Sequence, residues 1–392
     1  MKRKNSNNRY LEDPERQKRH GALFLTILFC AVLGLGTASL LFLPKQTYSP
    51  REKHALSTFP RFTMDNLLDG SFAEGVETYF SDHFPLRESF VGLQAYVGLL
   101  SGRNGENGIY CGHDGWLLNA PIDADTESLR LNLESLNAFQ QQTGLPATLL
   151  VVPSTGYMLP NELPRNHLPY PDASLLRQAQ QQTANQWDWV DVRGALSGNA
   201  AQSYYHTDHH WTSMGAYLAY CAFAQTRGFT PLPENAFQKV AYPNFYGTTY
   251  AQSGYWLTPP DTIELWENPE LHVQVEIFDD GVEGSQKSDS VFFLENLEGE
   301  DQYTVFLNGN HSLVRITNPQ AAGGKLLILK DSFSHCLAPF LASHYQEIDL
   351  IDLRYYTQSA VSDLVQERGI TEILACYGLD DLVNDANFTF LR

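Results

Sequence analysis

Between residues 147 and 377 the sequence alternates short apolar runs with segments of helical periodicity. The clearest apolar runs are Ala147–Val152, Lys325–Lys330, Glu347–Leu353 and Thr371–Tyr377. Continuous apolar runs of this length are typical of strands that are covered on both faces, and strands joined by helices form parallel sheets. The alternation therefore predicts an α/β domain built on a mostly parallel sheet between two layers of helices.

A long segment rich in tyrosine and proline, residues 229–300, interrupts this alternation, and we interpret it as an insertion. Within it, residues 271–278 alternate in polarity and predict an edge strand. The helices that the periodicity predicts in the domain cover residues 125–144, 172–186, 212–227, 333–343 and 358–368, with a short strand at 189–192.

The N-terminal region contains 23 residues without a charge, Gly21–Leu43, enough for a helix to span about 30 Å of hydrocarbon. The segment before this run is basic, which predicts a cytoplasmic N-terminus under the positive-inside rule. A cleaved signal peptide is the alternative, but the small residues Thr37–Ser39 lie inside the apolar run and not after it. We expect a single-pass cell-membrane protein with a basic tail (1–20), a transmembrane helix (21–43), a linker (44–60) and an extracytoplasmic domain (61–392).

The charge of the chain argues against a nucleic-acid partner. The formal net charge is −19, and because the first 43 residues carry +4, the remainder carries −23. A domain this acidic lacks the basic surface that nucleic-acid binding requires. The five cysteines contain no C-x-x-C pair, which excludes a zinc ribbon or a thioredoxin motif. We expect no cofactor.

Two distant segments carry residue types suited to acyl transfer. Asp208 precedes His210 by two residues, and Ser332 follows the predicted strand 325–330 at the start of a predicted helix. Ligands of parallel sheets bind beyond the carboxyl ends of the strands, where Ser332 would lie. If the segments meet, a carboxylate can orient an imidazole that activates the serine as a nucleophile. Alternatively, Asp331 or Ser332 only caps the helix.

The histidine-rich segment also allows other interpretations. His206, Asp208, His209 and His210 offer imidazole and carboxylate ligands that suit zinc, which would give a metal-dependent hydrolase. No H-x-x-x-H or H-E-x-x-H spacing occurs on a predicted helix, so our preferred interpretation has no metal. A structural cluster of hydrogen-bonded histidines is the third alternative. We interpret Trp211 as a packing wall beside the imidazole.

The segment Thr207–Trp211 resembles the motif that names the DHHW protein family. It is also similar to the T-D-x-H-W motif of alginate-type O-acetyltransferases with an SGNH-hydrolase-like domain. Further blocks resemble both groups in the same order and cover most of residues 60–378; they are Tyr79–Arg87, Gly112–Leu117, Val151–Pro153 with Leu163-Pro164, Phe306–His311 and Lys330–Phe333. In one departure, Tyr377-Gly378 stands where related sequences carry Tyr-Asn.

This resemblance implies a flavodoxin-like three-layer α/β/α domain. It implies Ser332 as nucleophile, His210 as base and Asp208 as the orienting carboxylate. The implied activity is transfer of an acetyl group to a hydroxyl of a cell-envelope or secreted polysaccharide, or its hydrolysis by an acetylesterase. A membrane-bound O-acyltransferase is the implied acetyl donor, because acetyl-CoA is not expected outside the membrane.

The remaining candidate residues concern binding. Asn310 and the backbone N–H of Gly309 or Ser332 are candidates for an oxyanion hole. Trp211, Tyr246, Tyr250 and Trp256 are candidates for stacking on sugar rings. Such aromatic residues would equally serve a non-catalytic glycan-binding or polysaccharide-assembly factor on the same fold, and this alternative stays open.

Overall fold

The structure is a computed structural model that describes residues 14–42, 44–280 and 284–391. The chain divides into two compact units, which we describe separately. The first contains the chain up to Pro50 together with His54–Val91, and the second contains Arg51–Lys53 and Gly92–Arg392.

The first unit begins with the long helix α1 (Pro14–Phe42). Its segment Lys18–Leu40 is long and apolar enough to cross a membrane, and its side chains are exposed. Most of the predicted basic tail lies outside the described residues. The predicted linker is not simply extended, because the short strands β1 (Tyr48–Ser49) and β2 (His54–Ala55) pair antiparallel. Three helices follow, of which the last continues into the second unit: α2 (Met64–Leu68), α3 (Ser71–Asp82) and α4 (Arg87–Leu100).

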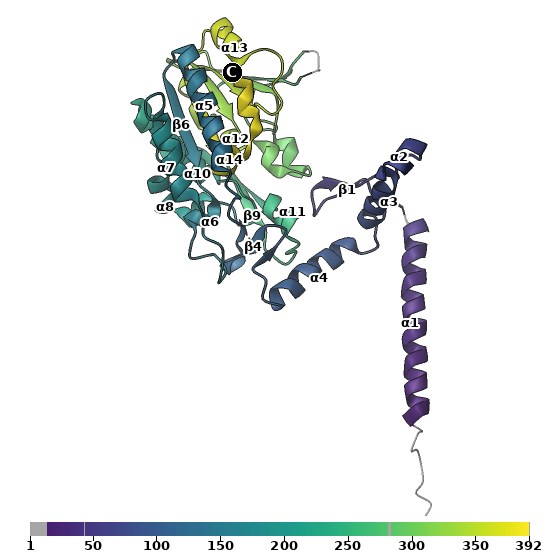
Figure 1. The fold of residues 1–392 in the computed structure, drawn as a ribbon. Coiled ribbons are helices and arrows are strands. Elements are labelled where there is room, and N and C mark those ends of the chain that lie inside the picture. The colour runs from purple at the N-terminus through teal and green to yellow at the C-terminus, as the bar shows by residue number, and fades with distance from the viewer. Residues whose placement is uncertain (1–13, 43, 281–283, 392) are drawn as a thin grey trace, which may run out of the picture. The chain divides into compact units, whose positions relative to one another are not determined.

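The second unit is built on an eight-stranded sheet (Figure 1). Five neighbouring strands run parallel, which confirms the predicted α/β domain with a mostly parallel sheet. The remaining three strands pair antiparallel with their neighbours. In spatial order the strands are β11 (Gln286–Ser288), β10 (Gln274–Phe278), β12 (Leu313–Thr317), β14 (Tyr345–Ile351), β13 (Gly323–Lys330), β15 (Glu372–Gly378), β6 (Ala147–Val152) and β7 (Asp188–Val190).

The prediction of an edge strand at residues 271–278 is wrong. Strand β10 pairs with β12 on one side and with β11 on the other, so both of its edges are hydrogen-bonded. The alternation in polarity that suggested an edge reflects its burial pattern, in which only Val275 and Ile277 are buried. The short strand β11 forms the edge instead.

Helices cover both faces of this sheet, as expected from its continuous apolar strands. In β13, Leu326 and Ile328 belong to one hydrophobic core, whereas Leu327 and Leu329 belong to the other. This alternation follows from the two-residue period of a strand. The first core packs against α10 (Ser213–Arg227) and α12 (Phe333–Leu341), and the second against α5 (Thr126–Thr143), α7 (Asp172–Thr183), α13 (Val361–Arg368) and α14 (Leu379–Asn384). The result is a three-layer α/β/α domain.

The predicted insertion is folded. It contains the antiparallel pair β8 (Gln238–Phe245) and β9 (Asp261–Glu267), with the helix α11 (Thr248–Ser253) between them. A three-stranded sheet also precedes α5 and consists of β3 (Gly105–Glu106), β4 (Ile109–Cys111) and β5 (Leu117–Asn119). The remaining helices are short: α6 (Thr155–Met158), α8 (Arg193–Ser197), α9 (Ala200–Ser203) and the 3₁₀ turns at His113–Gly115, Glu234–Ala236, Leu294–Glu298, Gln302–Val305 and Ala386–Leu391.

Candidate active site

Residues from two distant segments meet at the carboxyl end of the sheet. The Nε2 atom of His210 lies 2.6 Å from the Oγ atom of Ser332, 122 residues away in sequence. The Nδ1 atom of the same imidazole lies 2.5 Å from Oδ1 of Asp208. An ionised carboxylate only accepts hydrogen bonds, so Nδ1 carries the proton and Nε2 is left to accept from the Ser332 hydroxyl. This is the hydrogen-bond order that a serine nucleophile with a histidine base requires.

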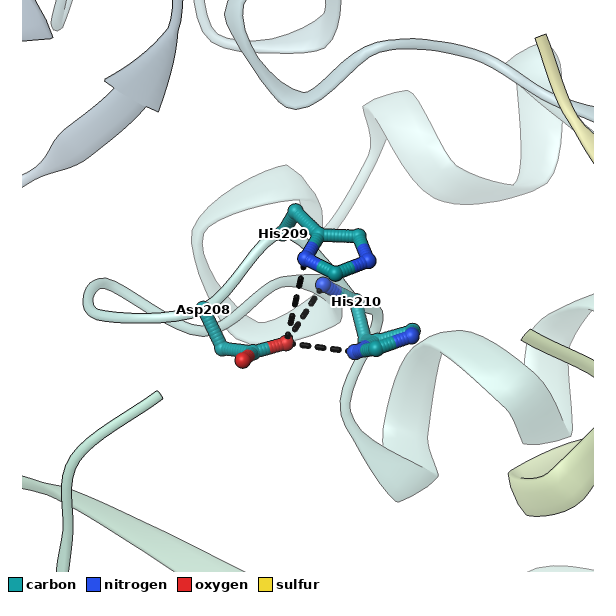
Figure 2. Close-up of side chains that lie close together, drawn as sticks. All are labelled: Asp208, His209 and His210. Atoms are coloured by element: carbon teal, nitrogen blue, oxygen red, sulfur yellow. Dashed lines mark hydrogen bonds and ion pairs between the residues drawn. The ribbon is translucent and has the colours of Figure 1, made fainter. Parts of the chain in front are cut away.

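Asp208 is buried, and its carboxylate accepts hydrogen bonds from His210 and Thr248; Figure 2 shows those from His210. It accepts from the backbone N–H of His210 at 2.9 Å and from Thr248, at 2.7 Å from the backbone N–H and 3.1 Å from the hydroxyl. Burial alone would raise the pKa of Asp208, but the imidazoles of His210 and His209 and the hydrogen bonds lower it well below its usual range. The carboxylate therefore stays ionised at neutral pH.

Gly247 allows the backbone before α11 to lie close to Asp208. A Cβ atom at Gly247 would overlap the Asp208 carboxylate, so only glycine fits at this close contact. The helix α11 starts at the next residue and presents the N–H of Thr248 to the carboxylate. The predicted insertion thus supplies part of the candidate site. Sequence reasoning missed Gly247 and Thr248, because a Gly-Thr pair after a strand looks like any other turn.

The imidazole of His210 is enclosed by aromatic rings. Tyr303 stacks on it with centroids 4.0 Å apart and planes at 7°, and the His209 ring lies 3.8 Å away. The edge of Phe333 approaches at 5.1 Å. His210 is only 5% exposed, so bulk water has little access to this imidazole. Burial and the neighbouring His210 lower the pKa of His209 to about 4, and this second imidazole is neutral at physiological pH.

The turn at Ser332 shows that this serine is not the cap of α12. Its side chain makes no capping hydrogen bond within the described part of the chain, since Oγ is bonded to His210. Asp331 takes the capping role and accepts from the N–H of Phe333 at 2.9 Å. Its second oxygen accepts from the N–H of Gly378, 2.5 Å away, at the end of β15. Asp331 thus ties the turn after β13 to the neighbouring parallel strand.

A cavity of about 280 Å³ opens beside Ser332. The segments that line it follow the carboxyl ends of β13, β15 and β6, where ligands of parallel sheets bind. The helix α11 adds Gln252, again from the predicted insertion. The lining residues are Asn119, Ala120, Ile122, Val152, Pro153, Ser154, Thr155, His209, Gln252, Asp331, Ser332, Phe333, Gly378, Leu379, Asp380 and Asp381.

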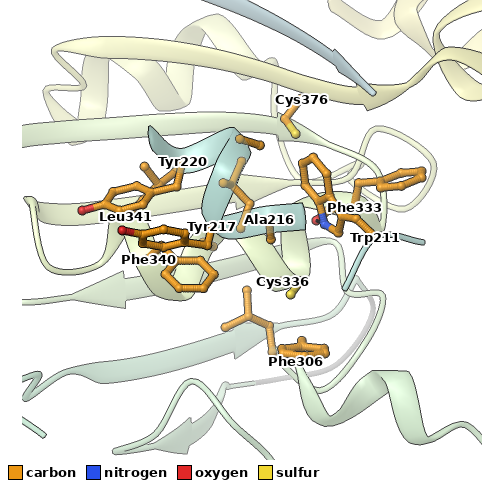
Figure 3. Packing of buried hydrophobic residues seen from close by; sticks show 14 of the residues in the cluster. Trp211, Ala216, Tyr217, Tyr220, Phe306, Phe333, Cys336, Phe340, Leu341 and Cys376 are labelled. Atoms are coloured by element: carbon orange, nitrogen blue, oxygen red, sulfur yellow. Dashed lines mark hydrogen bonds between the residues drawn. The ribbon is translucent and has the colours of Figure 1, made fainter. Parts of the chain in front are cut away.

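The aromatic residues predicted to bind sugar lie elsewhere. Trp211 is completely buried in the hydrophobic core beside Phe333 (Figure 3) and donates from Nε1 to the carbonyl of Phe333 at 3.0 Å, so it cannot stack on a substrate. Tyr250 is buried between Tyr246 and Trp256, with ring centroids 4.2 and 5.0 Å away. None of these residues is among the described residues that line the cavity. Tyr246 and Trp256 are half-buried, and stacking on a sugar stays a prediction for these two residues.

The predicted oxyanion residues Asn310 and Gly309 are also absent from the described cavity lining. Asn310 instead accepts a hydrogen bond from Lys330 Nζ at 3.4 Å. Lys330 is completely buried and binds Asp352 at 2.9 Å and His335 at 2.8 Å. Among the three predicted oxyanion-hole donors, only the backbone N–H of Ser332 belongs to a residue that lines the described cavity. The buried Lys330 holds the end of β13 in place.

The geometry fits a shared proton better than a metal ion. Asp208, His209 and His210 offer donor atoms within 4.8 Å of one another. However, the 2.5 Å separation between His210 Nδ1 and Asp208 Oδ1 is shorter than the distance of about 3 Å between two ligands of one zinc ion. The Nδ1 atom of His209 is bonded to Thr248 Oγ1 at 2.6 Å. His206 pairs with Asp261 at 3.1 Å and lies outside this group of described residues.

Comparison with known proteins gives two family matches. The family described as an SGNH hydrolase-like domain of the acetyltransferase AlgX matches residues 109–269, and the family described as DHHW protein matches residues 52–111 and 195–351. Among curated proteins, the chain is 25% identical over 207 residues to a probable alginate O-acetylase AlgJ of Pseudomonas syringae pv. tomato, a match that covers 50% of each chain. The match to its namesake from Pseudomonas putida is 26% over 181 residues, which is 43% of this chain and 47% of that one. The chain thus spans about half the length of these curated relatives.

Two solved structures share the fold. A DHHW family protein from Eubacterium siraeum superposes with a TM-score of 0.61 at 24% identity, covering 72% of this chain and 95% of that one. PatB1 of Bacillus cereus, solved with a sulfonyl adduct, superposes with a TM-score of 0.63 at 18% identity, covering 72% and 98%. The predicted SGNH-hydrolase-like fold and the predicted resemblance to both protein groups are confirmed.

Proposed function

The chain belongs to the DHHW protein family, and we propose that it is a serine-dependent O-acetyltransferase or acetylesterase of a polysaccharide. The observation that carries this proposal is the continuous hydrogen-bond chain from Ser332 through His210 to Asp208. A buried, ionised carboxylate, an imidazole in the correct tautomer and a serine free of capping duties are the three requirements of this chemistry.

The proposed reaction has two half-reactions. In the first, Nε2 of His210 takes the proton of Ser332 as Oγ attacks the acetyl carbonyl of the donor. The tetrahedral intermediate collapses, the alcohol of the donor leaves with the proton from His210, and an acetyl ester remains on Ser332. In the second, His210 deprotonates a sugar hydroxyl, which attacks the ester and releases Ser332 as its proton returns. Water in place of the sugar gives an esterase.

The names of the curated relatives support a polysaccharide substrate, since both are called probable alginate O-acetylases. The apolar segment of α1 supports membrane anchoring. We propose a cytoplasmic N-terminus and an extracytoplasmic catalytic domain, in which a membrane-bound O-acyltransferase would supply the acetyl group. A carbohydrate acceptor outside the cytoplasm and an acetyl-enzyme intermediate are compatible with this arrangement.

Intact-mass spectrometry of the detergent-solubilised full chain tests the nucleophile. After incubation with p-nitrophenyl acetate we expect one acetyl adduct, and after a sulfonyl fluoride one sulfonyl adduct. Both should disappear in Ser332→Ala. The matched control is Ser334→Ala, because Ser334 lies in the same turn but its hydroxyl donates to the carbonyl of Cys376 at 3.3 Å; this variant should still form both adducts.

Other outcomes favour the other candidate functions. A chain that never acylates but binds a glycan equally well with and without Ser332 is a binding or assembly factor. A hydrolase whose activity is removed by a chelator and restored by zinc uses the cluster of Asp208, His209 and His210 as a metal site. Acylation that persists in Ser332→Ala overturns the proposed nucleophile.

A further inference from the structure

His209 is the second imidazole of the candidate site, and the hydrogen bonds around it fix its tautomer. Its Nδ1 atom lies 2.6 Å from Oγ1 of Thr248, and the same hydroxyl lies 3.1 Å from Oδ2 of Asp208. An ionised carboxylate only accepts hydrogen bonds, so the single hydroxyl hydrogen of Thr248 is directed to Asp208. His209 therefore donates to Thr248 from Nδ1, which leaves its Nε2 atom unprotonated, with a free lone pair.

The lone pair of His209 Nε2 faces the cavity beside Ser332. His209 lines this cavity, and its side chain is 34% exposed, whereas the carboxylate that its Nδ1 edge faces is buried. The exposed edge of the ring is therefore the one with Nε2, which has no hydrogen-bond partner within the described part of the chain. Burial lowers the pKa of His209 to about 4, so at neutral pH Nε2 accepts hydrogen bonds and carries no charge.

The Nε2 atoms of His209 and His210 lie side by side. The centroids of the two rings are 3.8 Å apart, and their Nδ1 atoms both face Oδ1 of Asp208, at 3.9 and 2.5 Å. Figure 2 shows that the other nitrogen of each ring points away from Asp208 in the same direction. Because Nε2 of His210 is bonded to Ser332, the lone pair of His209 lies about one ring spacing from the proposed base.

A lone pair at this position suits the binding of the acetyl acceptor. It would repel the negative oxygen of a tetrahedral intermediate, so it does not belong to an oxyanion hole. It can instead accept a hydrogen bond from a neutral hydroxyl. Hydroxyls on adjacent carbons of a sugar are close enough to reach both Nε2 atoms, each through a hydrogen bond of about 2.8 Å.

We propose that His209 binds the acetyl acceptor, and that this acceptor presents two free hydroxyls on adjacent carbons. The inference rests on the proposed function, since it concerns the second half-reaction. One hydroxyl gives its proton to Nε2 of His210 as its oxygen attacks the acetyl ester; the ester bond to Ser332 breaks, and Oγ takes the proton from His210. The neighbouring hydroxyl keeps its proton and donates to Nε2 of His209. An acetylated neighbour has no such hydrogen, so the second hydroxyl of a pair reacts more slowly.

The test compares two alcohols that differ in the proposed hydrogen-bond donor. Ethylene glycol has two adjacent hydroxyls, and in 2-methoxyethanol a methyl ether replaces one of them. The full-length protein in detergent is acetylated with p-nitrophenyl acetate in a molar concentration of either alcohol, and the acetate ester of the alcohol is quantified. The yield with Ser332→Ala is subtracted as background. The acetyl adduct on Ser332 is measured in the same samples by intact-mass spectrometry.

The measured quantity is the ratio of the glycol ester to the methoxyethanol ester. The two equivalent hydroxyls of the glycol alone give a ratio of about two. A neutral hydrogen bond that forms only with the glycol multiplies the ratio by about 3 to 10. We therefore expect a ratio of about 6 to 20. A change in the base or in the acylation rate affects both alcohols alike and cancels in the ratio.

Two substitutions separate a binding role of His209 from a structural one. In His209→Asn the side-chain amide can donate to Thr248 from the position of Nδ1, but no lone pair remains at the position of Nε2. In His209→Gln the amide oxygen can occupy the position of Nε2, but the donor to Thr248 is lost. We expect the ratio to fall to about two in His209→Asn and to stay above this value in His209→Gln.

His206→Asn is the matched control, because His206 lies in the same loop, pairs with Asp261 at 3.1 Å and is outside the described cavity lining. This variant should keep the ratio. A ratio near two in the unchanged protein, no ester from either alcohol, or equal ratios in the two His209 variants overturns this proposal while the acetyl adduct on Ser332 persists. If no adduct forms, the proposed function itself fails.

Discussion

Replacing Asp208 by asparagine tests the central geometry with a change of few atoms. Oδ1 of Asp208 accepts from the N–H and Nδ1–H groups of His210, at 2.9 and 2.5 Å, while Oδ2 faces two donors of Thr248. Asparagine has one acceptor and one donor in place of these two acceptors. In one orientation its amide leaves the buried N–H of Thr248 unpaired. In the other it faces Nδ1 of His210 and forces the proton onto Nε2.

Both orientations weaken the base, and the second removes it. A proton on Nε2 would be donated towards Ser332, so the imidazole could not accept the hydroxyl proton. The same substitution in serine proteases lowers kcat about 10⁴-fold. We expect a loss of 10³- to 10⁴-fold in the acetylation rate of Ser332, which corresponds to about 4 to 5.5 kcal/mol of barrier.

The rate is measured as the burst of p-nitrophenol from p-nitrophenyl acetate, with thermal unfolding as a check of the fold. Asp261→Asn is the matched control: Asp261 holds the same loop through Thr207, at 2.7 Å from its N–H and 2.6 Å from its hydroxyl. It does not touch His210 in the described structure, and its substitution should cost about tenfold or less. A folded Asp208→Asn variant that acylates within tenfold of the unchanged protein would refute the proposed role of the carboxylate.

Three further predictions concern the surroundings of the site. In Gly378→Ala the added Cβ would lie 2.7 Å from the ring of Phe333. We therefore expect the unfolding free energy to fall by about 1–3 kcal/mol and the acylation of Ser332 to slow. An unchanged midpoint of urea denaturation would contradict this prediction. Lys330→Met leaves Asp352 without its buried partner and should lower the unfolding free energy, measured by urea denaturation, by about 3–5 kcal/mol. A loss under about 1 kcal/mol would show that Arg354 alone stabilises the Asp352 carboxylate. Because burial raises the pKa of Asp381, its stabilising contribution is complete below its ordinary pKa of 3.8 and is lost as pH rises through the folded-state pKa. Asp381→Asn should therefore gain in melting temperature relative to the unchanged protein between pH 4 and pH 7, and a relative loss over that range would contradict the sign.

The sequence was sufficient to predict the parallel strands and the residues that meet beyond them. Apolar runs such as Leu326–Leu329 have strand length, and their burial on both faces follows from their composition. The residues that contact Asp208 and His210 could not be predicted from the sequence, for a physical reason. Thr248 lies in α11 and Tyr303 in the 3₁₀ turn Gln302–Val305. They contact Asp208 and His210 from segments distant in sequence, and no periodicity links such segments.

The binding residues show a different limit. Trp211 and Tyr250 are aromatic residues of a kind that stacks on sugars, but aromatic rings also fill hydrophobic cores. Only the three-dimensional structure shows that these two rings are buried.

The helix α11 performs two tasks with residues four positions apart. Thr248 holds the carboxylate of Asp208, which is bonded to the candidate base, and Gln252 forms part of the wall of the cavity beside Ser332. Evolution towards a different glycan by changes in α11 is therefore constrained at the N-terminus of this helix. Substitutions at Gln252 could change the cavity wall and leave the hydrogen bonds of Asp208 intact. A shift of the helix by one residue would instead remove the Thr248 donors from Asp208.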